Sequence, residues 1–340
     1  MLRKQKILLL LTHFIVMGIF AQDVVADNML LFQRDNGGWP KHYLNKKINY
    51  TTIFSEAEKA TIKDEENRND ATIDNEATTK EIRYLLNIYK KLGTQKYLQA
   101  AEKGIDYLLT AQYKNGGWPQ FYPDLSSYRH LITYNDNAMI NALNVLQDIV
   151  EHKNDFDIVN PKYTEKATLA VQRGIDCILK TQLKVNQVLT GWCQQYDEFT
   201  LEPADARKFE LASIASSETV GIVYFLMRFK TPNENIKTSI KQAIAWLQQV
   251  KIDGFEYKDI DAPTLPKGKD RVLIPNKNES VWARFYDIKT GSPIFVGRDA
   301  QKHFQLSEIE HERRIGYGWY GTWPKKLLDK DFIKWEKELN

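Results

Sequence analysis

The chain has 340 residues with 47 Lys and Arg against 44 Asp and Glu, a formal net charge of +3, and 43% hydrophobic residues. This length can bury a core without cross-links, and Cys177 and Cys193 are too few for a disulfide framework, although one bridge between them is possible. A nearly neutral chain lacks the basic surplus with which proteins follow phosphates, so we expect no nucleic-acid partner.

The first 21 residues differ from the rest. Arg3, Lys4 and Lys6 precede an apolar run over 7–20, and Ala21 follows it. This order is typical of a secretory signal peptide cleaved near Ala21, and the run is too short for a stable transmembrane helix. We therefore expect a secreted or periplasmic protein without stable membrane insertion. The mature chain then has a formal net charge of zero (+3 − 3).

Aromatic loops recur along the chain at similar intervals. Gly37-Gly38-Trp39-Pro40 is followed by Gly116-Gly117-Trp118-Pro119 and Gly191-Trp192-Cys193-Gln194, with Trp-to-Trp steps of 79 (118 − 39) and 74 (192 − 118) residues. We expect a fourth, degenerate copy at Gly254-Phe255. Self-similarity at such a period indicates one supersecondary unit that is used several times.

Between these loops, apolar residues recur with the i, i+3, i+4, i+7 spacing of amphipathic helices. The predicted helices come in pairs, with apolar stripes over 82–89 and 98–109, 138–149 and 171–179, and 220–227 and 236–247. Three helical hairpins of similar length favour an all-α fold, an (α/α)₃ barrel or toroid, with an open superhelix as the alternative. From Pro263 onward the sequence becomes rich in turns, which predicts an irregular C-terminal region with short strands. We expect residues 22–340 to form a single domain.

A polar cluster stands before the first helix of each pair: Asp74-Asn75-Glu76, Asn135-Asp136-Asn137 and Ser216-Ser217-Glu218. Each cluster, taken alone, is typical of helix capping. In a toroid, equivalent helix starts lie on one rim, so Asp74 and Asp136 would face each other and offer oxygen ligands to a hard cation such as Ca²⁺.

The chain has 34 Lys and 13 Arg, yet Arg outnumbers Lys between residues 271 and 314. The arginines of this stretch are Arg271, Arg284, Arg298, Arg313 and Arg314. The planar guanidinium binds carboxylates with two parallel bonds, so the local exchange favours a carboxylated ligand. The alternative is pairing within the chain, with Glu308, Glu310 or Glu312, which would occupy one of the five. No Gly-x-Ser-x-Gly, Walker or His-Glu-x-x-His motif is present, which leaves nucleophilic hydrolase, nucleotide and zinc chemistry without support.

Several motifs together resemble the pectate lyases of polysaccharide lyase family 10. They extend over roughly residues 30–325 and comprise 115–123, 132–139, Pro203-Ala204-Asp205-Ala206-Arg207-Lys208-Phe209-Glu210, 284–287, 293–299 and 316–320. The resemblance implies a toroid with a cleft across one end. It also implies a secreted pectate lyase that cleaves polygalacturonate by Ca²⁺-dependent β-elimination and releases 4,5-unsaturated oligogalacturonides.

The same resemblance implies roles for individual residues. Arg207 would be the catalytic base, and Asp74 and Asp136 would hold Ca²⁺. The expected substrate-binding residues are Asn75, Trp118, Gln120, Arg284, Arg298 and Arg313. Trp39 and Trp192 are expected to be structural. Asn137 and Glu76 depart from the family pattern, where we expect an acid and a small residue, and an acid at position 76 could repel an anionic sugar.

The chemistry is consistent with these residue types, because a cation and arginines aimed at a carboxylate stabilise the charge that forms when the adjacent proton is removed. An arginine base requires neighbouring cations to lower its pKa, and implies an alkaline optimum. The alternatives are an inverting glycoside hydrolase that uses Asp74 and Asp136 as acid and base, and a non-catalytic pectin-binding protein. Nothing in the sequence predicts more than a monomer.

Overall fold

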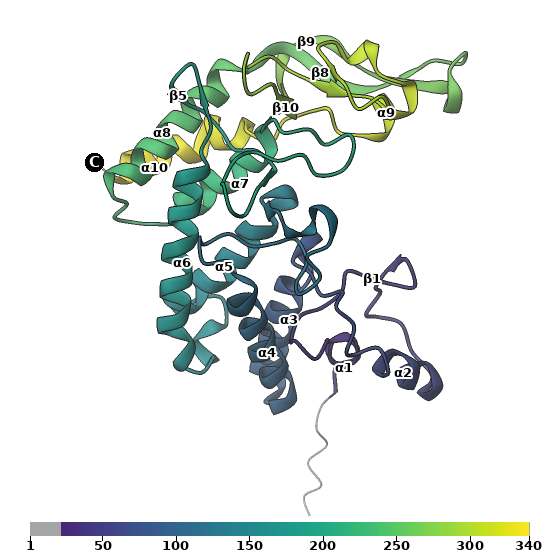
Figure 1. Ribbon diagram of the computed structural model, residues 1–340, viewed down its shortest axis with the longest axis vertical. Coiled ribbons are helices and arrows are strands. Elements are labelled where there is room, and N and C mark those ends of the chain that lie inside the picture. Colours follow the sequence, from purple (N-terminus) through teal and green to yellow (C-terminus); the bar gives the residue numbers. More distant parts are fainter. Residues whose placement is uncertain (1–21, 340) are drawn as a thin grey trace, which may run out of the picture.

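The computed structural model describes residues 22–339, so the predicted signal peptide lies outside the described residues. The mostly helical architecture is as predicted (Figure 1). The three predicted hairpins are α3 (Thr79–Leu92) with α4 (Gln95–Ala111), α5 (Ala138–Glu151) with α6 (Lys162–Thr181), and α7 (Ser216–Leu226) with α8 (Glu234–Gln249). Helix α1 (Val24–Phe32) packs against the first hairpin. The shorter helices are α2 (Glu56–Lys63), α9 (His311–Gly316) and α10 (Phe332–Leu339).

The hairpins stack in chain order to form two layers. The first helices, α3, α5 and α7, contact one another in sequence, and so do α4, α6 and α8 in the second layer. Within residues 22–339 the stack forms no closed barrel, so the predicted toroid is an open one (Figure 1). One apolar core runs through all three hairpins, from Ala26 to Trp335.

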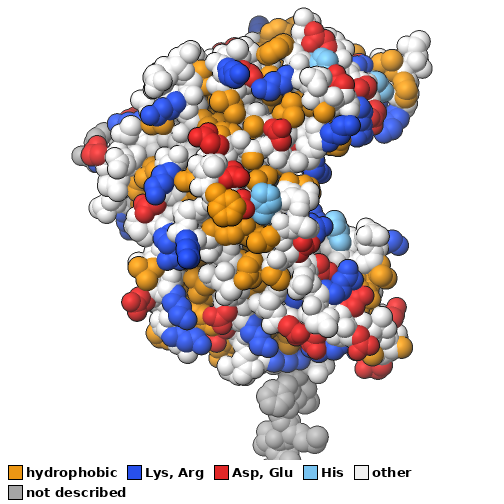
Figure 2. Space-filling model, viewed as in Figure 1, with side chains coloured by type: hydrophobic (Ala, Val, Ile, Leu, Met, Phe, Trp, Pro, Cys, Tyr) orange, Lys and Arg blue, Asp and Glu red, His pale blue; other side chains and the backbone are white. Residues whose placement is uncertain are grey.

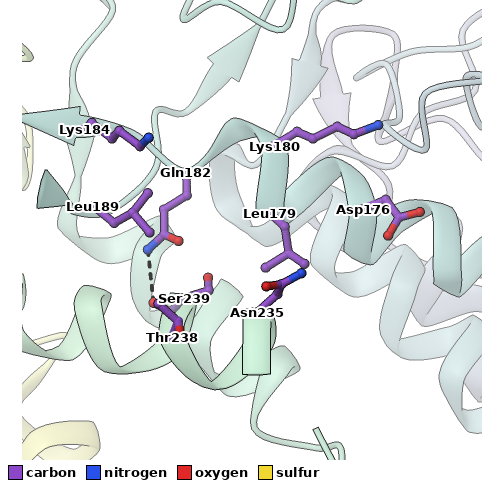
Figure 3. Close-up of a pocket in the computed structure, with 9 residues that line it drawn as sticks. All are labelled: Asp176, Leu179, Lys180, Gln182, Lys184, Leu189, Asn235, Thr238 and Ser239. Atoms are coloured by element: carbon purple, nitrogen blue, oxygen red, sulfur yellow. Dashed lines mark hydrogen bonds between the residues drawn. The ribbon is translucent and has the colours of Figure 1, made fainter. Parts of the chain in front are cut away.

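Glutamines at the ends of the second-layer helices join successive units. The side-chain amide of Gln112 donates to the carbonyls of Gly116, in its own loop, and of Ala170, on the next second-layer helix. The Gln182 amide likewise donates to the carbonyls of Thr190 and Ser239, and Figure 3 shows the bond to Ser239. Gln33 does so with Gly37 and Ala100. Each glutamine thus satisfies backbone acceptors where two repeats meet.

The tryptophan loops also repeat in three dimensions, and they correct one prediction. The indole nitrogens of Trp39, Trp118 and Trp192 each donate to a backbone carbonyl of a preceding helix. The fourth residue with this role is Trp282, which donates to Leu247 O on α8. Phe255, predicted as the fourth copy, lies in a strand and is 37% exposed. The sequence period fails here because a β-hairpin separates α8 from its tryptophan.

That hairpin is longer than the short strands we predicted. Strand β8 (Ile252–Asp261) pairs antiparallel with β9 (Lys269–Ala283), and β13 (Tyr320–Gly321) adds to β9. Consecutive charges, Lys269-Asp270-Arg271 in β9 and Lys258-Asp259 in β8, interrupt both strands, and the apolar runs of β9 are only three residues long, at 272–274 and 281–283. The other ladders are two-residue pairs: β1 (His42–Tyr43) with β2 (Lys46–Lys47), β3 (Ile132–Thr133) with β6 (Gln195–Tyr196), β4 (Lys184–Val185) with β5 (Val188–Leu189), β7 (Ile214–Ala215) with β10 (Phe285–Tyr286), and β11 (Phe295–Val296) with β12 (Lys302–His303). Short strands are predicted only from Pro263 onward, so the ladders formed by β1 to β6 are additional.

The state of the two cysteines and the search for a membrane-spanning helix complete the description of the fold. Cys177 and Cys193 are both buried and free, so the possible bridge between them is not formed. No helix within residues 22–339 is both long and apolar enough to cross a membrane.

Candidate active site

A deep notch separates the C-terminal β-region from the N-terminal segment around β1 (Figure 2). The short ladders bring polar residues of distant segments to the starts of α5 and α7. Strand β3 leads into α5, and β7 leads into α7 and pairs with β10, which follows Arg284. The C-terminal region is thereby tied to the start of α7, so residues far apart in sequence meet.

The starts of α3 and α5 share an unusual backbone. Asn75 and Glu76 have φ of 50° and 65°, and Asp136 and Asn137 have φ of 51° and 58°. Successive left-handed pairs also occur in three loops, at 44–45, 154–155 and 186–187, so the feature alone does not mark a site, but its place at two equivalent helix starts shows a repeated turn. By this match Asn75 corresponds to Asp136, and buried Asp74 corresponds to Asn135. The two acids therefore occupy successive positions of the repeated turn rather than the same one.

Asp74 is almost completely buried at 2% exposure. The ammonium of Lys41, the residue after the first tryptophan loop, donates to Asp74 Oδ2, whereas Oδ1 is buried with no partner among the described residues. The backbone N–H of Asp74 donates to Thr72 Oγ1, which fixes the carboxylate in place. Sequence reasoning missed Lys41, although its place directly after a repeat loop was a signal.

Asp136 belongs to a charged network with Glu218 and Arg284. Arg284 Nη2 lies 3.1 Å from Glu218 Oε1 and 3.9 Å from Asp136 Oδ1. Burial, followed by the nearby Glu218, raises the pKa of Asp136, and Asp74 adds to this against the effect of Arg284. The two predicted metal-binding acids are therefore close enough to influence each other. Glu218, from the third polar cluster, is a buried member of this site that we had not assigned.

These residues suit a hard cation. Asp74 Oδ1, Asn137 Oδ1 and Glu218 Oε2 are buried oxygens with no hydrogen-bond partner among the described residues, and oxygen atoms are the ligands that Ca²⁺ prefers. Within residues 22–339 no three acidic, His or Cys side chains are grouped as a metal cage.

Arg207 lies on the irregular segment before β7 and forms a bidentate ion pair with Glu210. Its Nε lies 2.7 Å from Glu210 Oε2, and Nη2 bonds Oε1. This pair outweighs partial burial and raises the pKa of Arg207, with smaller contributions from Tyr128 and Tyr317. The structure therefore holds Arg207 as a cation, opposite to what a base requires, unless Glu210 is drawn away.

The ring of Phe209, on the same segment, lies between two predicted substrate-binding arginines. The guanidinium carbons of Arg298 and Arg313 lie 5.1 and 4.6 Å from its centroid. Burial and then the charge of Arg298 lower the pKa of Arg313. Arg298 also forms an ion pair with Glu312, which agrees with the alternative that one of the five arginines pairs within the chain. Two like charges packed this closely indicate a site prepared for an anion.

Tyr317 joins the two halves of the site. Its ring lies 5.1 Å from the guanidinium carbon of Arg284 and 5.5 Å from that of Arg313. Burial raises its pKa to about 12, so the phenol is neutral at physiological pH. The family motif contains Tyr317, but nothing in its spacing indicated this central position. Arg271 and Arg314, by contrast, bond Asp259 and Asp270 and stabilise the β-hairpin.

One of the predicted substrate-binding residues is corrected. Trp118 is fully buried and its indole nitrogen donates to Leu108 O, so it is a packing residue like Trp39 and Trp192. Gln120 is 7% exposed, and its backbone carbonyl accepts from Thr72 Oγ1 and Ile73 N, which supports the turn before Asp74. Its side-chain Oε1 has no partner among the described residues, so its role in binding stays a prediction. Asn75 is exposed beside that turn.

A separate hollow of about 470 Å³ lies between α6 and α8 on the other side of the hairpins (Figure 3). Lys180, Lys184 and Asn235 are among its lining residues, and it contains none of the predicted site residues.

Comparisons with known proteins identify the family of the chain. The sequence pattern of the family described as pectic acid lyase matches residues 33–328. A family 10 polysaccharide lyase from Cellvibrio cellulosa is 31% identical over 92% of both chains, with a TM-score of 0.78. An Asp-to-Ala mutant of a family 10 lyase from the same organism, solved with trigalacturonic acid, is 32% identical over 91% of both chains, with a TM-score of 0.79. No curated protein matched the chain.

The fold and the match together define a polysaccharide lyase. The chain belongs to the pectic acid lyase family and to polysaccharide lyase family 10. It is an enzyme, a pectate lyase.

Proposed function

We propose that the protein is a secreted pectate lyase that cleaves polygalacturonate by Ca²⁺-dependent β-elimination and releases 4,5-unsaturated oligogalacturonides. The observation that carries this proposal is that Asp136 and Glu218 lie beside Arg284, with Asp74 near Asp136, and that Tyr317 joins Arg284 to Arg313. Guanidinium groups suit a carboxylate, and nearby buried oxygens without hydrogen-bond partners suit a divalent cation. The related lyase solved with trigalacturonic acid supports the same class of substrate.

The arginines would bind and orient galacturonate carboxylates, and Asp74 and Asp136 would hold the Ca²⁺. A bound Ca²⁺ supplies positive charge that stabilises the enediolate-like anion formed at the reacting carboxylate. Arg207, in its neutral form, takes the proton from C5, and the exposed Asn75 would bind the sugar. The electron pair of the C5–H bond forms the C4–C5 double bond as the C4–O4 bond breaks, and the departing oxygen takes a proton from water.

The Arg207–Glu210 pair sets a condition on this mechanism. As long as Glu210 accepts both guanidinium bonds, Arg207 stays protonated. The charge of Glu210 also acts on Arg313. We propose that substrate binding weakens the pair, because the cation and the other arginines lower the proton affinity of Arg207 while Glu210 turns toward Arg313.

The product identifies the reaction. The protein without residues 1–21 is incubated with polygalacturonate at alkaline pH, with Ca²⁺ or with EDTA, and reducing ends and ultraviolet absorbance are followed together. Absorbance of an unsaturated uronide that EDTA abolishes supports the proposal. Reducing ends without absorbance would indicate a hydrolase, and binding without either would indicate a pectin-binding protein.

A further inference from the structure

A second hollow opens on the N-terminal wall of the notch, next to Asp74. It is formed by the segment 40–45, by Arg68 and by the turn from Phe121 to Arg129. Its volume of about 550 Å³ lies within the range of about 300–1,000 Å³ that is usual for small-molecule sites. None of the residues to which we gave a role in catalysis or metal binding lines it.

The hollow is lined by cations that are held in place. The guanidinium carbon of Arg129 lies 4.6 Å from the centroid of the Phe121 ring, and Lys41 Nζ lies 5.9 Å from the same centroid. Arg68 lies on the same wall. One aromatic ring thus positions two positive charges before a ligand arrives, which lowers the entropy lost on binding.

The acids that pair with these cations mostly lie outside the lining. Asp74, the partner of Lys41, is 2% exposed, and Asp124 and Glu65, the partners of Arg129 and Arg68, do not line the hollow. The one acid in the lining, Asp70, accepts two bonds from buried Arg34 and also lies 3.4 Å from Arg68 Nε, so its charge is shared between two arginines. The surface that faces the hollow is therefore cationic and suits an anion.

The hollow is continuous with the proposed reaction site. Lys41 lines it and also bonds Asp74. Phe121 forms a β-bridge with Thr72, two residues before Asp74. Tyr128 lines it and lies close enough to Arg207 to affect its charge. A sugar in the hollow could thus belong to the same polysaccharide chain as the sugars that lie beside Asp74 and Arg207.

From this geometry we propose that the hollow is a subsite for a further uronic-acid residue of the substrate, whose carboxylate is bound by Arg129, Lys41 and Arg68. The proposal rests on the proposed polygalacturonate substrate. The enzyme then binds long oligogalacturonides more tightly than short ones, because a short chain that covers the reaction site leaves the hollow empty.

The test compares ligand lengths in the wild type, Arg129→Gln and a matched control, Arg271→Gln. Arg271, like Arg129, pairs with one aspartate and lies against an aromatic ring, but on the β-hairpin. Dissociation constants for galacturonate oligomers of two to six units are measured by calorimetry with Ca²⁺, and folding is checked by circular dichroism. We expect Arg129→Gln to weaken binding of the longest oligomer about tenfold, as for loss of a charge-assisted bond, and the shortest by less than a factor of two. Arg271→Gln should change neither.

An equal loss at every length, or no loss at any length, would overturn the subsite. Arg68→Gln tests the hollow independently if Arg129→Gln fails to fold, and it should show the same dependence on length. Length-dependent binding by a protein that forms no unsaturated product would instead reject the proposed lyase reaction and keep the subsite.

Discussion

Arg207 and Glu210 form a bidentate ion pair on the segment that leads into β7, with Arg207 Nε 2.7 Å from Glu210 Oε2. Glu210 is buried, whereas the side chain of Arg207 is 53% exposed. The buried acid therefore influences the protonation of the more exposed proposed base.

Replacing Glu210 by Gln should move the pH–rate profile. The carboxylate raises the pKa of Arg207, so its removal lets the neutral base form at lower pH. We expect the midpoint of the alkaline rise in kcat to move down by about one pH unit, measured from the absorbance of the unsaturated product. The control is Glu202→Gln, an exposed acid on the same segment. An unchanged midpoint in Glu210→Gln would show that Arg207 does not limit the profile.

Substitution of Asp136 by Asn should weaken Ca²⁺ binding. The change removes one charge from the oxygen cluster but keeps the shape of the side chain, so we expect about a 10–100-fold loss of affinity, typical of altered metal sites. Calorimetry with CaCl₂ and no sugar gives the affinity without reference to activity. Asp253→Asn, on the β-hairpin, is the control and should bind as the wild type does. Unaltered affinity in Asp136→Asn would remove Asp136 from the proposed site.

The sequence could predict the three hairpins because their helices repeat an apolar stripe between glycine loops. It could also predict which segments meet at the site, because the starts of α3 and α5 are repeated and the Arg207 segment belongs to a family motif. It could not show that Glu210 pairs with Arg207, that Lys41 pairs with Asp74 or that Tyr317 contacts two arginines. These contacts depend on how the irregular C-terminal region folds back on α7, and no local period encodes that path.

Trp118 illustrates the opposite error. Its loop repeats those of Trp39 and Trp192, which are expected to be structural, yet Trp118 is predicted to bind substrate. In the structure the ring fills the space between units and bonds Leu108 O. Large aromatic residues in repeat loops serve both packing and sugar binding, and sequence alone does not separate the two.

Trp118→Phe should therefore affect stability and not binding. Loss of the indole hydrogen bond and part of the buried volume should lower the free energy of unfolding by about 1–3 kcal/mol. Trp192→Phe should lower it by a similar amount. Urea denaturation measures both, and calorimetry with trigalacturonate at a temperature where each variant is folded should give wild-type affinity. Weakened binding with unchanged stability would show that Trp118 contacts the substrate.

Asp287 predicts how stability depends on pH. It is 5% exposed and accepts bonds from Lys302 Nζ and from the backbone of Thr290. Burial alone would raise its pKa, but these bonds prevail and lower the pKa from 3.8 to about 2. The resulting stability is fully present above pH 3.8 and is lost as the pH falls toward 2.

Asp287→Asn should accordingly reduce the free energy of unfolding by about 1–2 kcal/mol at pH 7, and the difference from the wild type should shrink below pH 3.8. Denaturation at several pH values measures it, with the exposed Asp261→Asn as control. A difference that stays constant down to pH 2 would mean that packing, and not the charge of Asp287, is the cause.

The central claim, that Arg207 removes the C5 proton in a cleft that binds substrate without it, is tested most directly by Arg207→Ala. Turnover of polygalacturonate and Ca²⁺-dependent binding of trigalacturonate are measured on the same preparation. We predict that kcat falls at least about 10²–10⁴-fold, the usual contribution of a general base, while the dissociation constant changes little. Near-normal turnover in this variant would contradict the account.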